Sequence, residues 1–506
     1  MTTSDTSWLV FWLVALFAAC IFLSHGRQFW SDEVFDWTVA RDPSFHHMLF
    51  AWRSGADVGG IFFYLGARAW MRLFGESALA LRLFTAFGVW IALAFTWTTA
   101  RRWFRLEIVA VCLPFCWLTA HSVLRQLMIG RFYGLLLAAT AAVVYCYALA
   151  AEDLAPNYRL LVAIFATNCL LVGTHPLGVL YSGVILAATL ILDATRRTWR
   201  PKLYLAAIAG WIILWPYRFT LQASAIVAKP HFWTIAPTGD DLRNAMVFWT
   251  DELQWLWAIL LVAIIVFSVF QIAKKRTPLE KMHAPSLIVG FALMAVIPLL
   301  WFLSLRGTSY FVDRYLLPTI IGAALLQCAA FQYLVPRVRP RWLTSILIVS
   351  VAAVAAGSAY SFFNDIHWYR EPPHSYTDSL AALLPKNAPI VVERVDIFTE
   401  ATTTRPDLQL LYLLDWDTVI LPESPRGEPS GYHELENWQR AGYHAAAIEP
   451  SAQFLTTHSD FWVISDPTEL WFDRRVRNNP AFEAEQAGTF RREDSTETIW
   501  HVRRIP

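Results

Sequence analysis

Residues 8–23 read WLVFWLVALFAACIFL, and a short polar segment after them leads to Trp30-Ser31-Asp32-Glu33. A long uninterrupted apolar run predicts a membrane-spanning helix. The residues before the run contain no Lys or Arg, and similar runs recur along the chain, which favours a spanning helix over a cleaved signal peptide. The sequence therefore predicts that Asp32 and Glu33 lie where a first membrane helix meets water.

The overall composition agrees with this prediction. Of 506 residues, 56% are hydrophobic and only 16% are charged, whereas about a quarter of the residues in a soluble domain are charged. The net charge of +1 gives no basic surplus, which argues against a nucleic-acid-binding protein. All six cysteines lie in apolar runs and none follows Cys328, so the sequence excludes a disulfide framework in the polar C-terminal region.

The apolar runs predict a polytopic α-helical membrane protein with about eleven spanning helices. They are centred near residues 16, 90, 113, 141, 166, 184, 210, 262, 293, 324 and 351, and the third is short and contains Pro114. Alternate short loops carry the basic residues, which are Arg101, Arg102, Arg105, Arg159, Arg196, Arg197, Arg200, Lys202, Lys274, Lys275, Arg276, Lys281, Arg337, Arg339 and Arg341. Such an excess marks the cytoplasmic side. We therefore expect a cytoplasmic N-terminus, with the acidic loop and the region after Tyr360 on the outer side.

The composition changes after Tyr360, where no run is long enough to span a membrane. Short β-like stretches at residues 390–395, 461–464 and 498–502 alternate with helical patterns at residues 379–384 and 432–441. We therefore predict two domains, a transmembrane module over residues 1–360 and a small extracytoplasmic α/β domain over residues 361–506.

The predicted first outer loop, at about residues 25–77, is apolar enough to contain helices that lie in the membrane interface. Residues 61–74 read IFFYLGARAWMRLF and place Arg68 and Arg72 one helical turn apart, so both could face lipid headgroups. Residues 44–53 could form a second interfacial helix. The alternative is that this loop packs as a domain that does not touch the membrane.

Asp32 and Glu33 are the first candidates for chemistry. A carboxylate can deprotonate a hydroxyl group as that hydroxyl attacks a sugar carbon. The second carboxylate could orient the first or help to hold a divalent cation. The alternative is that Ser31 caps a helix whose first turn carries both carboxylates, where the helix dipole favours them. The two interpretations are compatible.

A second group of candidates is cationic. Arg131, His175 and Arg314 stand at the predicted outer ends of spanning helices. An arginine at the centre of a bilayer costs about 2.5 to 3.5 kcal/mol on insertion scales, so such residues sit at a boundary or face a cavity. Because guanidinium groups bind phosphate in a bidentate manner, the three residues predict a site for a lipid-linked phosphate. For each residue alone, snorkelling to the interface competes, as does a pair with Asp313 for Arg314.

Two further motifs are set aside. Asp415-Trp416-Asp417 has the pattern by which soluble nucleotide-sugar transferases hold a metal, but it follows a β-like run, where a turn or strand edge is favoured. Cys112 and Cys116 lie one helical turn apart in an apolar run, which favours helix packing over metal binding. The sequence contains no G-x-G-x-x-G or P-loop motif, so no nucleotide site is predicted.

Several short motifs, taken in order, resemble a known family. They are Trp30-Ser31-Asp32-Glu33, WMRLFGES at residues 70–77, Leu81-Arg82-Leu83, GRFYGL at residues 130–135, THPLG at residues 174–178 and RYLLP at residues 314–318. Over residues 8–335 the chain resembles the GT-C superfamily of polytopic membrane glycosyltransferases. Within it, the likeness is to the bacterial branch of family 39 and the dolichyl-phosphate-mannose protein mannosyltransferases, including the lipid A aminoarabinose transferase type.

The resemblance implies an inverting hexosyl- or pentosyltransferase in the bacterial cytoplasmic membrane. It would move a sugar from a polyprenyl-phosphate donor to an extracytoplasmic glycan, lipid or protein. By position it implies Asp32 as the general base with Glu33 beside it, and as donor-phosphate contacts Arg131, Arg314, His175 and Arg82. The chain departs from the family at residues 57–61, DVGGI, where many relatives carry His-Pro-Pro-Leu after an acidic residue. That departure leaves the role of Asp57 and the acceptor open.

Two other functions fit parts of the sequence. A transporter or flippase of lipid-linked sugars would need acidic or polar residues inside its spanning helices. Few occur here, and Asp193 lies at a predicted cytoplasmic end. A non-catalytic membrane scaffold would bind partners through its outer domain and would not need Asp32.

Overall fold

The computed structural model describes residues 3–24, 27–215, 234–246, 284–334, 376–425, 428–491 and 495–505. The chain divides into two compact units. Unit 1 comprises Met1–His25, Arg82–Trp215 and Ala236–Arg370, and unit 2 comprises Gly26–Leu81, Pro216–Ile235 and Glu371–Pro506. The predicted first outer loop thus shares a compact unit with the C-terminal region. The domain boundary at residue 360 stays a prediction.

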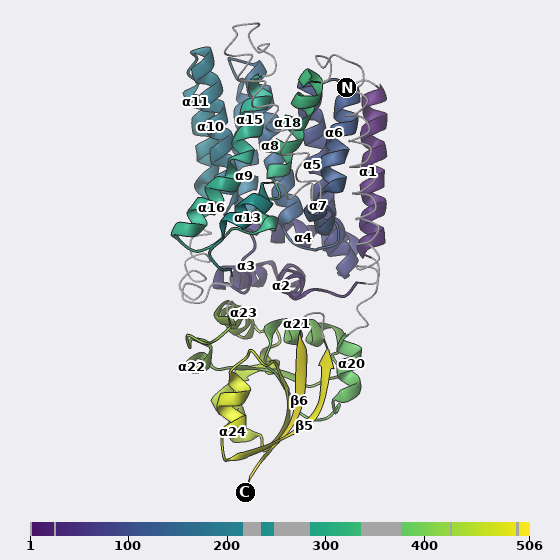
Figure 1. Cartoon of the computed structure of the whole chain (residues 1–506), viewed down its shortest axis with the longest axis vertical. Helices are drawn as coiled ribbons and strands as arrows, with labels where there is room; N and C mark the ends of the chain where they lie inside the picture. Colours follow the sequence, from purple (N-terminus) through teal and green to yellow (C-terminus); the bar gives the residue numbers. More distant parts are fainter. Residues whose placement is uncertain are drawn as a thin grey trace. The chain divides into compact units, whose positions relative to one another are not determined.

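Unit 1 is helical in its described residues, and Figure 1 shows its long helices lying alongside one another. The helices are α1 (Thr3–Ser24), α5 (Ala78–Trp103, whose first turn belongs to unit 2), α6 (Leu106–Thr119), α7 (His121–Gln126), α8 (Tyr133–Glu152), α9 (Tyr158–Thr174), α10 (Gly178–Arg196), α11 (Pro201–Ala209), η1 (Gly210–Ile213), α13 (Gly239–Ala245), α15 (Ala284–Met294), α16 (Val296–Arg306), α17 (Asp313–Leu316) and α18 (Thr319–Leu334).

Five helical segments in the described part of the chain are long and apolar enough to cross a membrane, namely Thr3–Ser24, Ala78–Trp103, Tyr133–Glu152, Gly178–Arg196 and Ala284–Arg306. They coincide with the runs predicted near residues 16, 90, 141, 184 and 293. Shorter apolar helices coincide with the runs near residues 166, 210 and 324. Helix α6, with Pro114 inside it, matches the run near residue 113. The runs near residues 262 and 351 lie outside the described residues, and the total number of spans stays a prediction.

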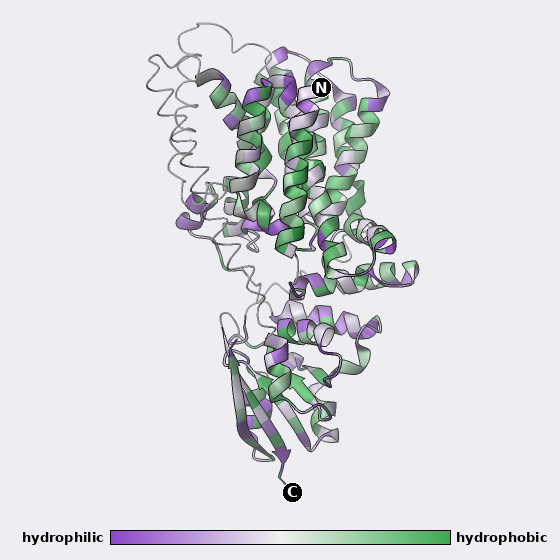
Figure 2. Ribbon diagram, turned by 90° about the vertical axis from the view of Figure 1, so that its right-hand side faces the viewer, coloured by the Kyte–Doolittle hydropathy of each residue, from purple (hydrophilic) through white to green (hydrophobic). Residues whose placement is uncertain are grey.

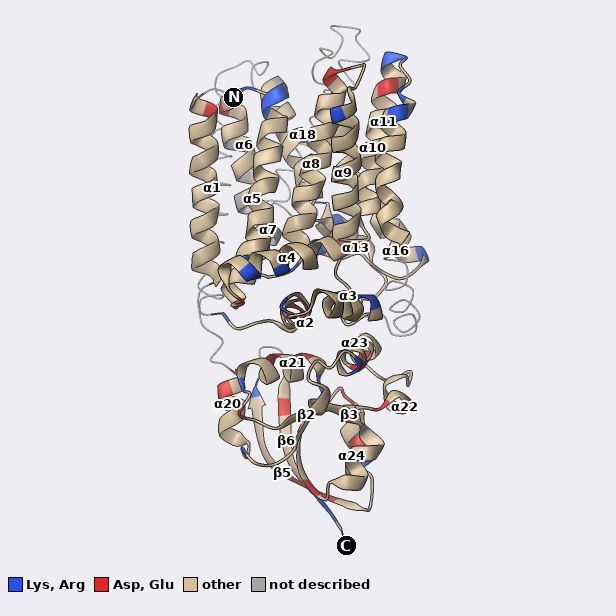
Figure 3. Cartoon of the chain, turned by 180° about the vertical axis from the view of Figure 1, so that it is seen from behind, with Lys and Arg blue, Asp and Glu red and all other residues tan. Residues whose placement is uncertain are grey.

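Charged residues of unit 1 gather near the ends of its helices, while hydrophobic residues dominate their length (Figures 2 and 3). Helices in hydrocarbon are expected to show this distribution because burying a charge there is costly. Arg101, near the end of α5, pairs with Asp5 near the start of α1 at 2.6 Å. Helices α1 and α5 therefore run antiparallel.

Unit 2 combines helices with one mixed sheet. Its helices are α2 (Ser31–Ala40), α3 (Phe45–Ser54), α4 (Ile61–Phe74), α20 (Tyr376–Leu383), α21 (Val395–Thr404), α22 (Trp416–Val419), α23 (Glu428–Arg440), η4 (Ala445–Ala447), α24 (Ser451–Thr457) and η5 (Asp473–Arg477). Its strands are β1 (Ile390–Val392), β2 (Leu410–Leu414), β3 (Ile448–Pro450), β4 (Asp460–Ser465), β5 (Phe482–Arg491) and β6 (Thr496–Arg504).

The sheet has the strand order β3-β2-β1-β4-β6-β5. Strands β3, β2, β1 and β4 are parallel, and β6 is antiparallel to both β4 and β5. Val391 pairs with Val463, and both side chains join a buried core that includes Phe454, Phe461 and Phe472. Strands β1, β4 and β6 and helices α20 and α23 occupy the predicted stretches, whereas β2, β3 and β5 lie outside them. The predicted α/β character of the C-terminal region is confirmed.

Helices α2 and α3 pack on the C-terminal part of unit 2. The Phe35 ring lies 4.7 Å from the Trp438 ring. The indole Nε1 of Trp438 donates to the carbonyl of Ala56 at 3.0 Å, and the Tyr443 hydroxyl donates to the Asp42 carboxylate. The segment that contains Asp32 is therefore held by residues about 400 positions further along the chain.

The two arginines of α4 brace the corner between α2 and α3. Arg68 donates to the carbonyls of Asp42 and Pro43, and Arg72 donates to that of Pro43 at 3.4 Å. Large apolar side chains on α3 and α4 remain exposed, namely Phe45, Phe50, Leu73 and Phe74. That these helices lie in the membrane interface stays a prediction.

Candidate active site

Arg131 lies just before α8, where close helix packing fixes the backbone. The Thr85 hydroxyl of α5 donates to the carbonyl of Arg131 at 2.9 Å. A Cβ atom on Gly134 would overlap the backbone of Thr85, so only glycine allows α8 to approach α5 this closely. The side chain of Arg131 is only 5% exposed, and its guanidinium carbon lies 4.9 Å from the centre of the Phe132 ring.

Arg314 belongs to the short helix α17. Its guanidinium carbon lies 5.9 Å from the Tyr133 ring centre and 5.8 Å from that of Tyr315. Tyr181 of α10 fixes this helix, because its hydroxyl donates to the carbonyl of Tyr315 at 2.6 Å. Arg131 and Arg314 therefore approach neighbouring rings, Phe132 and Tyr133, from two separate segments.

His175 joins the two arginines at the end of α9. Its ring stacks on Phe132, with centroids 4.8 Å apart, and lies 5.2 Å from the Tyr315 ring. Burial, followed by the positive charges of Arg131 and Arg314, lowers the pKa of His175 to about 3. The imidazole is therefore neutral at physiological pH. Its Nδ1 accepts from the Leu177 amide at 3.2 Å, which assigns the proton to Nε2.

The structure thus brings three of the sequence-predicted residues together. Arg131, His175 and Arg314 form a cluster of two cations and one neutral N–H donor, which we call the cationic cluster, framed by Phe132, Tyr133 and Tyr315. A set of charged and neutral N–H donors in an aromatic frame suits an anion such as a phosphate.

Arg82 occupies a different position on α5. It lies one turn before Thr85, and its side chain is 1% exposed. Its guanidinium donates to the carbonyl of Ser24 at the end of α1, at 3.5 Å. This contact fastens α1 to α5, and a role of Arg82 in binding a donor phosphate stays a prediction.

Asp32 and Glu33 lie in the first turn of α2 in unit 2. Glu33 is 1% exposed, and its Oε2 accepts from the backbone amide of Trp30 at 3.0 Å. The N-terminal capping residue is Trp30, so Ser31 is the first helical residue and does not cap the helix as the alternative interpretation had it. Asp32 is partly exposed at the second helical position. The two carboxylates therefore differ, with Glu33 fixing the helix start and Asp32 partly open to solvent.

Carboxylate, imidazole and thiolate groups are the usual protein ligands of metal ions. No group of three or more His, Cys, Asp or Glu side chains in the described ranges could hold an ion. Asp415, from the D-x-D pattern, is instead bound by Arg475 at 2.6 and 2.8 Å. That Asp32 or Glu33 helps to hold a divalent cation stays a prediction.

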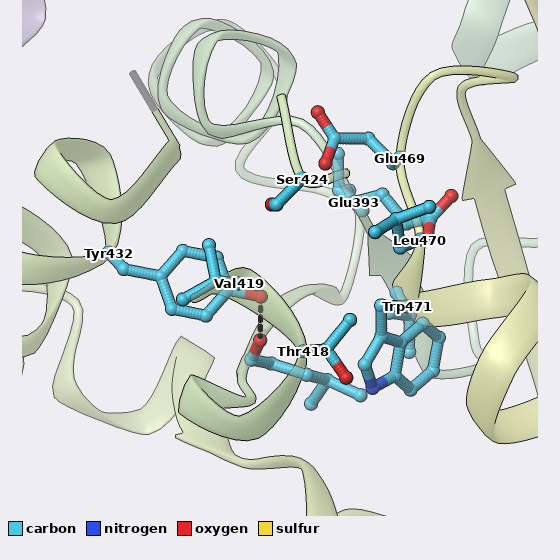
Figure 4. Close-up of a pocket in the computed structure, with 11 residues that line it drawn as sticks. Glu393, Thr418, Val419, Ser424, Tyr432, Glu469, Leu470 and Trp471 are labelled. Carbon is cyan, nitrogen blue, oxygen red and sulfur yellow. Dashed lines mark hydrogen bonds between the residues drawn. The ribbon is translucent and has the colours of Figure 1, made fainter. Parts of the chain in front are cut away.

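A pocket in the sheet of unit 2 contains further carboxylates (Figure 4). Burial raises the pKa of Glu393, one of its lining residues, to about 8. Glu393 accepts from the amides of Asp466 and Phe472 at 3.3 and 2.7 Å, and Tyr432 donates to the carbonyl of Leu413 at 3.3 Å. These polar groups serve the packing of the domain, and we assign the pocket no role in catalysis.

Sequence reasoning missed the aromatic frame of the cationic cluster and every residue that anchors α2. The frame left a signal, because Phe132, Tyr133 and Tyr315 directly follow the two arginines in the chain. The anchors left none, since Glu400 and Thr399 lie in a helix almost 370 positions away from Ser31.

Comparison with solved structures identifies the fold. No protein-family model matches the chain, and no curated protein matches it either. ArnT from Cupriavidus metallidurans bound to undecaprenyl phosphate superposes with a TM-score of 0.62 at 13% identity, covering 98% of both chains. The apo oligosaccharyltransferase of Archaeoglobus fulgidus gives a TM-score of 0.51 at 12% identity, covering 92% of this chain and 70% of that one.

The protein is therefore a polytopic membrane protein with the GT-C fold. Its similarity to ArnT extends over the transmembrane helices and the C-terminal α/β region alike, since nearly the whole of both chains is covered. The predicted resemblance to GT-C proteins is confirmed at the level of the fold.

Proposed function

We propose that this protein is a glycosyltransferase that moves a hexosyl or pentosyl unit from a polyprenyl-phosphate-linked donor to an extracytoplasmic acceptor. The cationic cluster is the observation that carries the proposal. The GT-C fold supports it by analogy, because the similar ArnT structure binds undecaprenyl phosphate. The loops that carry the basic residues support a bacterial cytoplasmic membrane protein with a cytoplasmic N-terminus.

The cluster suits a phosphate that leaves a sugar. A polyprenyl-phosphate sugar is a phosphodiester with one negative charge, and cleavage of the bond to the sugar leaves a monoester that carries more. Two guanidinium groups and a neutral N–H donor stabilise the later state more than the earlier one, because the added charge develops on oxygens that they contact. A protonated His175 is not required for this effect.

Asp32 supplies the base in this proposal. The acceptor hydroxyl oxygen attacks the anomeric carbon, the bond from that carbon to the phosphate oxygen breaks, and its electron pair passes to the phosphate. Asp32 takes the hydroxyl proton. A single displacement of this kind inverts the anomeric configuration. Glu33 keeps the first turn of α2 in place by holding the Trp30 amide.

Two measurements test the proposal. Undecaprenyl phosphate should raise the melting temperature of the full-length protein in nanodiscs, whereas undecaprenol, which lacks the phosphate, should not. With a panel of undecaprenyl-phosphate-linked sugars and bacterial envelope extract as acceptor, Asp32→Asn should slow release of undecaprenyl phosphate about a hundredfold to ten-thousandfold. Equal stabilisation by both lipids would contradict the phosphate site. Turnover by Asp32→Asn at the wild-type rate would reject the base.

A further inference from the structure

The start of helix α2 is held by a carboxylate from the C-terminal part of the chain. The amide of Ser31 donates to Oε1 of Glu400 in α21 at 3.0 Å. The other carboxylate oxygen, Oε2, accepts from the Tyr376 hydroxyl at 2.6 Å. Next to it, the Thr399 hydroxyl lies 3.2 Å from the Ser31 hydroxyl. Ser31, Thr399 and Glu400 are all buried, and all belong to unit 2.

Helix α2 begins without an ordinary N-terminal cap. The first amides of a helix have no partner within it and are commonly satisfied by a Ser, Thr, Asp or Asn side chain just before the helix. The residue in that place is Trp30, whose side chain cannot accept such a bond. Two carboxylates satisfy other amides at the helix start: Glu33 accepts from the Trp30 amide, as in a capping box, and Glu400 accepts from the Ser31 amide. The amides on which they act directly precede Asp32.

We infer that Glu400 and Thr399 are positioning residues for Asp32, and that orienting this carboxylate is a function of the C-terminal region. The inference rests on the proposed function, in which Asp32 is the base. The direction of the Asp32 side chain follows from the backbone of residues 30–33, because Cα–Cβ vectors in a helix are fixed by its first turn. A displacement of about 1 Å in a catalytic group can cost about a hundredfold in rate.

A purely structural contact makes a different prediction. It would lower the stability or the amount of folded protein, but each folded molecule would turn over normally. A positioning contact lowers kcat in molecules that are folded and that still bind the donor lipid. The structural and the positioning role are distinguished by measuring kcat, KM for the donor and affinity for undecaprenyl phosphate on the same full-length preparation.

Helix α21 provides a matched pair of variants. Thr399 and Thr403 both donate their hydroxyl to the carbonyl four residues earlier, at 2.9 Å in each case. Of the two, Thr399 contacts Ser31. Thr399→Ala should therefore lower kcat several-fold, while Thr403→Ala should leave it unchanged. Glu400→Ala should lower kcat about tenfold to a hundredfold with KM unchanged. Glu400→Gln keeps an oxygen acceptor for the Ser31 amide and should recover most of the rate.

Hydrogen exchange gives a readout that does not depend on turnover. Glu400→Ala should speed exchange of the Ser31 amide in peptides spanning residues 27–37, and Thr403→Ala should not. Wild-type kcat in both Thr399→Ala and Glu400→Ala would overturn the inference, while an inactive Asp32→Asn would leave the proposed function standing. An active Asp32→Asn would reject the proposed base itself. If Glu400→Ala fails to fold, Thr399→Ala and Glu400→Gln decide the question.

Discussion

A buried arginine lies at each end of helix α8, and the two arginines have different surroundings. At its C-terminal end Arg200 is held by Asp193 at 2.9 and 2.7 Å, and Tyr204 donates to the same carboxylate at 2.6 Å. At its N-terminal end Arg131 lies against the Phe132 ring and beside the neutral His175. The first arrangement neutralises its arginine within the fold. The second gathers Arg131, Arg314 and the neutral N–H donor of His175 around aromatic rings, a set of groups that suits an incoming anion.

The largest effect is expected at the neutralised end. Asp193→Ala leaves the buried Arg200 without its carboxylate and should lower the free energy of unfolding by about 3 to 5 kcal/mol. Denaturation in mixed micelles measures this change. Affinity for undecaprenyl phosphate, measured per folded molecule, should stay at the wild-type value because the cationic cluster lies at the other end of α8.

Glu152→Ala is the matched control for that prediction. Glu152 pairs with Arg102 at the same end of the bundle, but both side chains are partly exposed. Losing such a pair should cost no more than about 1 kcal/mol. Two outcomes would contradict this difference between the two ends of α8. One is an equal loss of unfolding free energy in Asp193→Ala and Glu152→Ala, and the other is a weakened affinity of Asp193→Ala for the lipid.

The next effect concerns the cationic cluster. Arg131→Ala and Arg314→Ala should each slow release of undecaprenyl phosphate about a hundredfold to a thousandfold, the usual cost of removing one group that stabilises developing charge. Arg131→Lys should recover only part of the rate, because an ammonium cannot bind a phosphate in a bidentate manner.

Arg306 provides the control for the arginine variants. It is exposed at the end of α16, and its guanidinium carbon lies 5.0 Å from the Phe302 ring. Arg306→Ala removes an arginine stacked on an aromatic ring outside the cluster and should not alter the rate. A similar loss in Arg306→Ala and Arg131→Ala would show that the cluster has no special part in turnover.

The grouping of residues at the N-terminal end of α8 could be predicted from sequence. Helices that span a membrane alternate in direction, so the start of α8, the end of α9 and the start of α17 were expected on one face. That reasoning grouped Arg131, His175 and Arg314 correctly. It could not show that His175 stacks on Phe132, because ring geometry depends on side-chain packing and leaves no period in the sequence.

The anchoring of α2 could not be predicted for a related reason. Local sequence patterns relate residues that are only a few positions apart, and they identify Asp32 and Glu33 as the start of a helix. They placed the cap at Ser31, one residue after its observed position at Trp30. The partner of the Ser31 amide is Glu400, and no hydrophobic period or motif connects residues so far apart in the chain.

A smaller effect is expected from His175 as a donor. His175→Ala removes one N–H group from the cluster and should weaken binding of undecaprenyl phosphate about tenfold, since a hydrogen bond to a charged group contributes about 1.5 kcal/mol at the lower end of its range. His175→Asn retains an N–H donor and should bind more tightly than the alanine variant. Lipid titration in nanodiscs distinguishes the two variants. Equal affinity in wild type and His175→Ala would show that His175 does not contact the phosphate.

The smallest effect is a dependence of stability on pH. The pKa of His175 is about 3 in the folded protein and about 6.5 ordinarily. Well above pH 6.5 neither state binds a proton there, so the residue contributes no pH dependence. Below it the unfolded chain takes up a proton that the folded protein does not, so stability falls as the pH falls. From pH 7.5 to 5.5 wild type should lose about 1.4 kcal/mol more unfolding free energy than His175→Asn.

Bound phosphate should reduce that loss. The positive charges of Arg131 and Arg314 help to keep the pKa of His175 low, and an anion between them would offset this effect. The extra acid sensitivity of wild type over His175→Asn should therefore shrink when undecaprenyl phosphate is present and stay the same with undecaprenol. If the phosphate lipid leaves the difference between the two proteins unchanged, the anion does not bind beside His175.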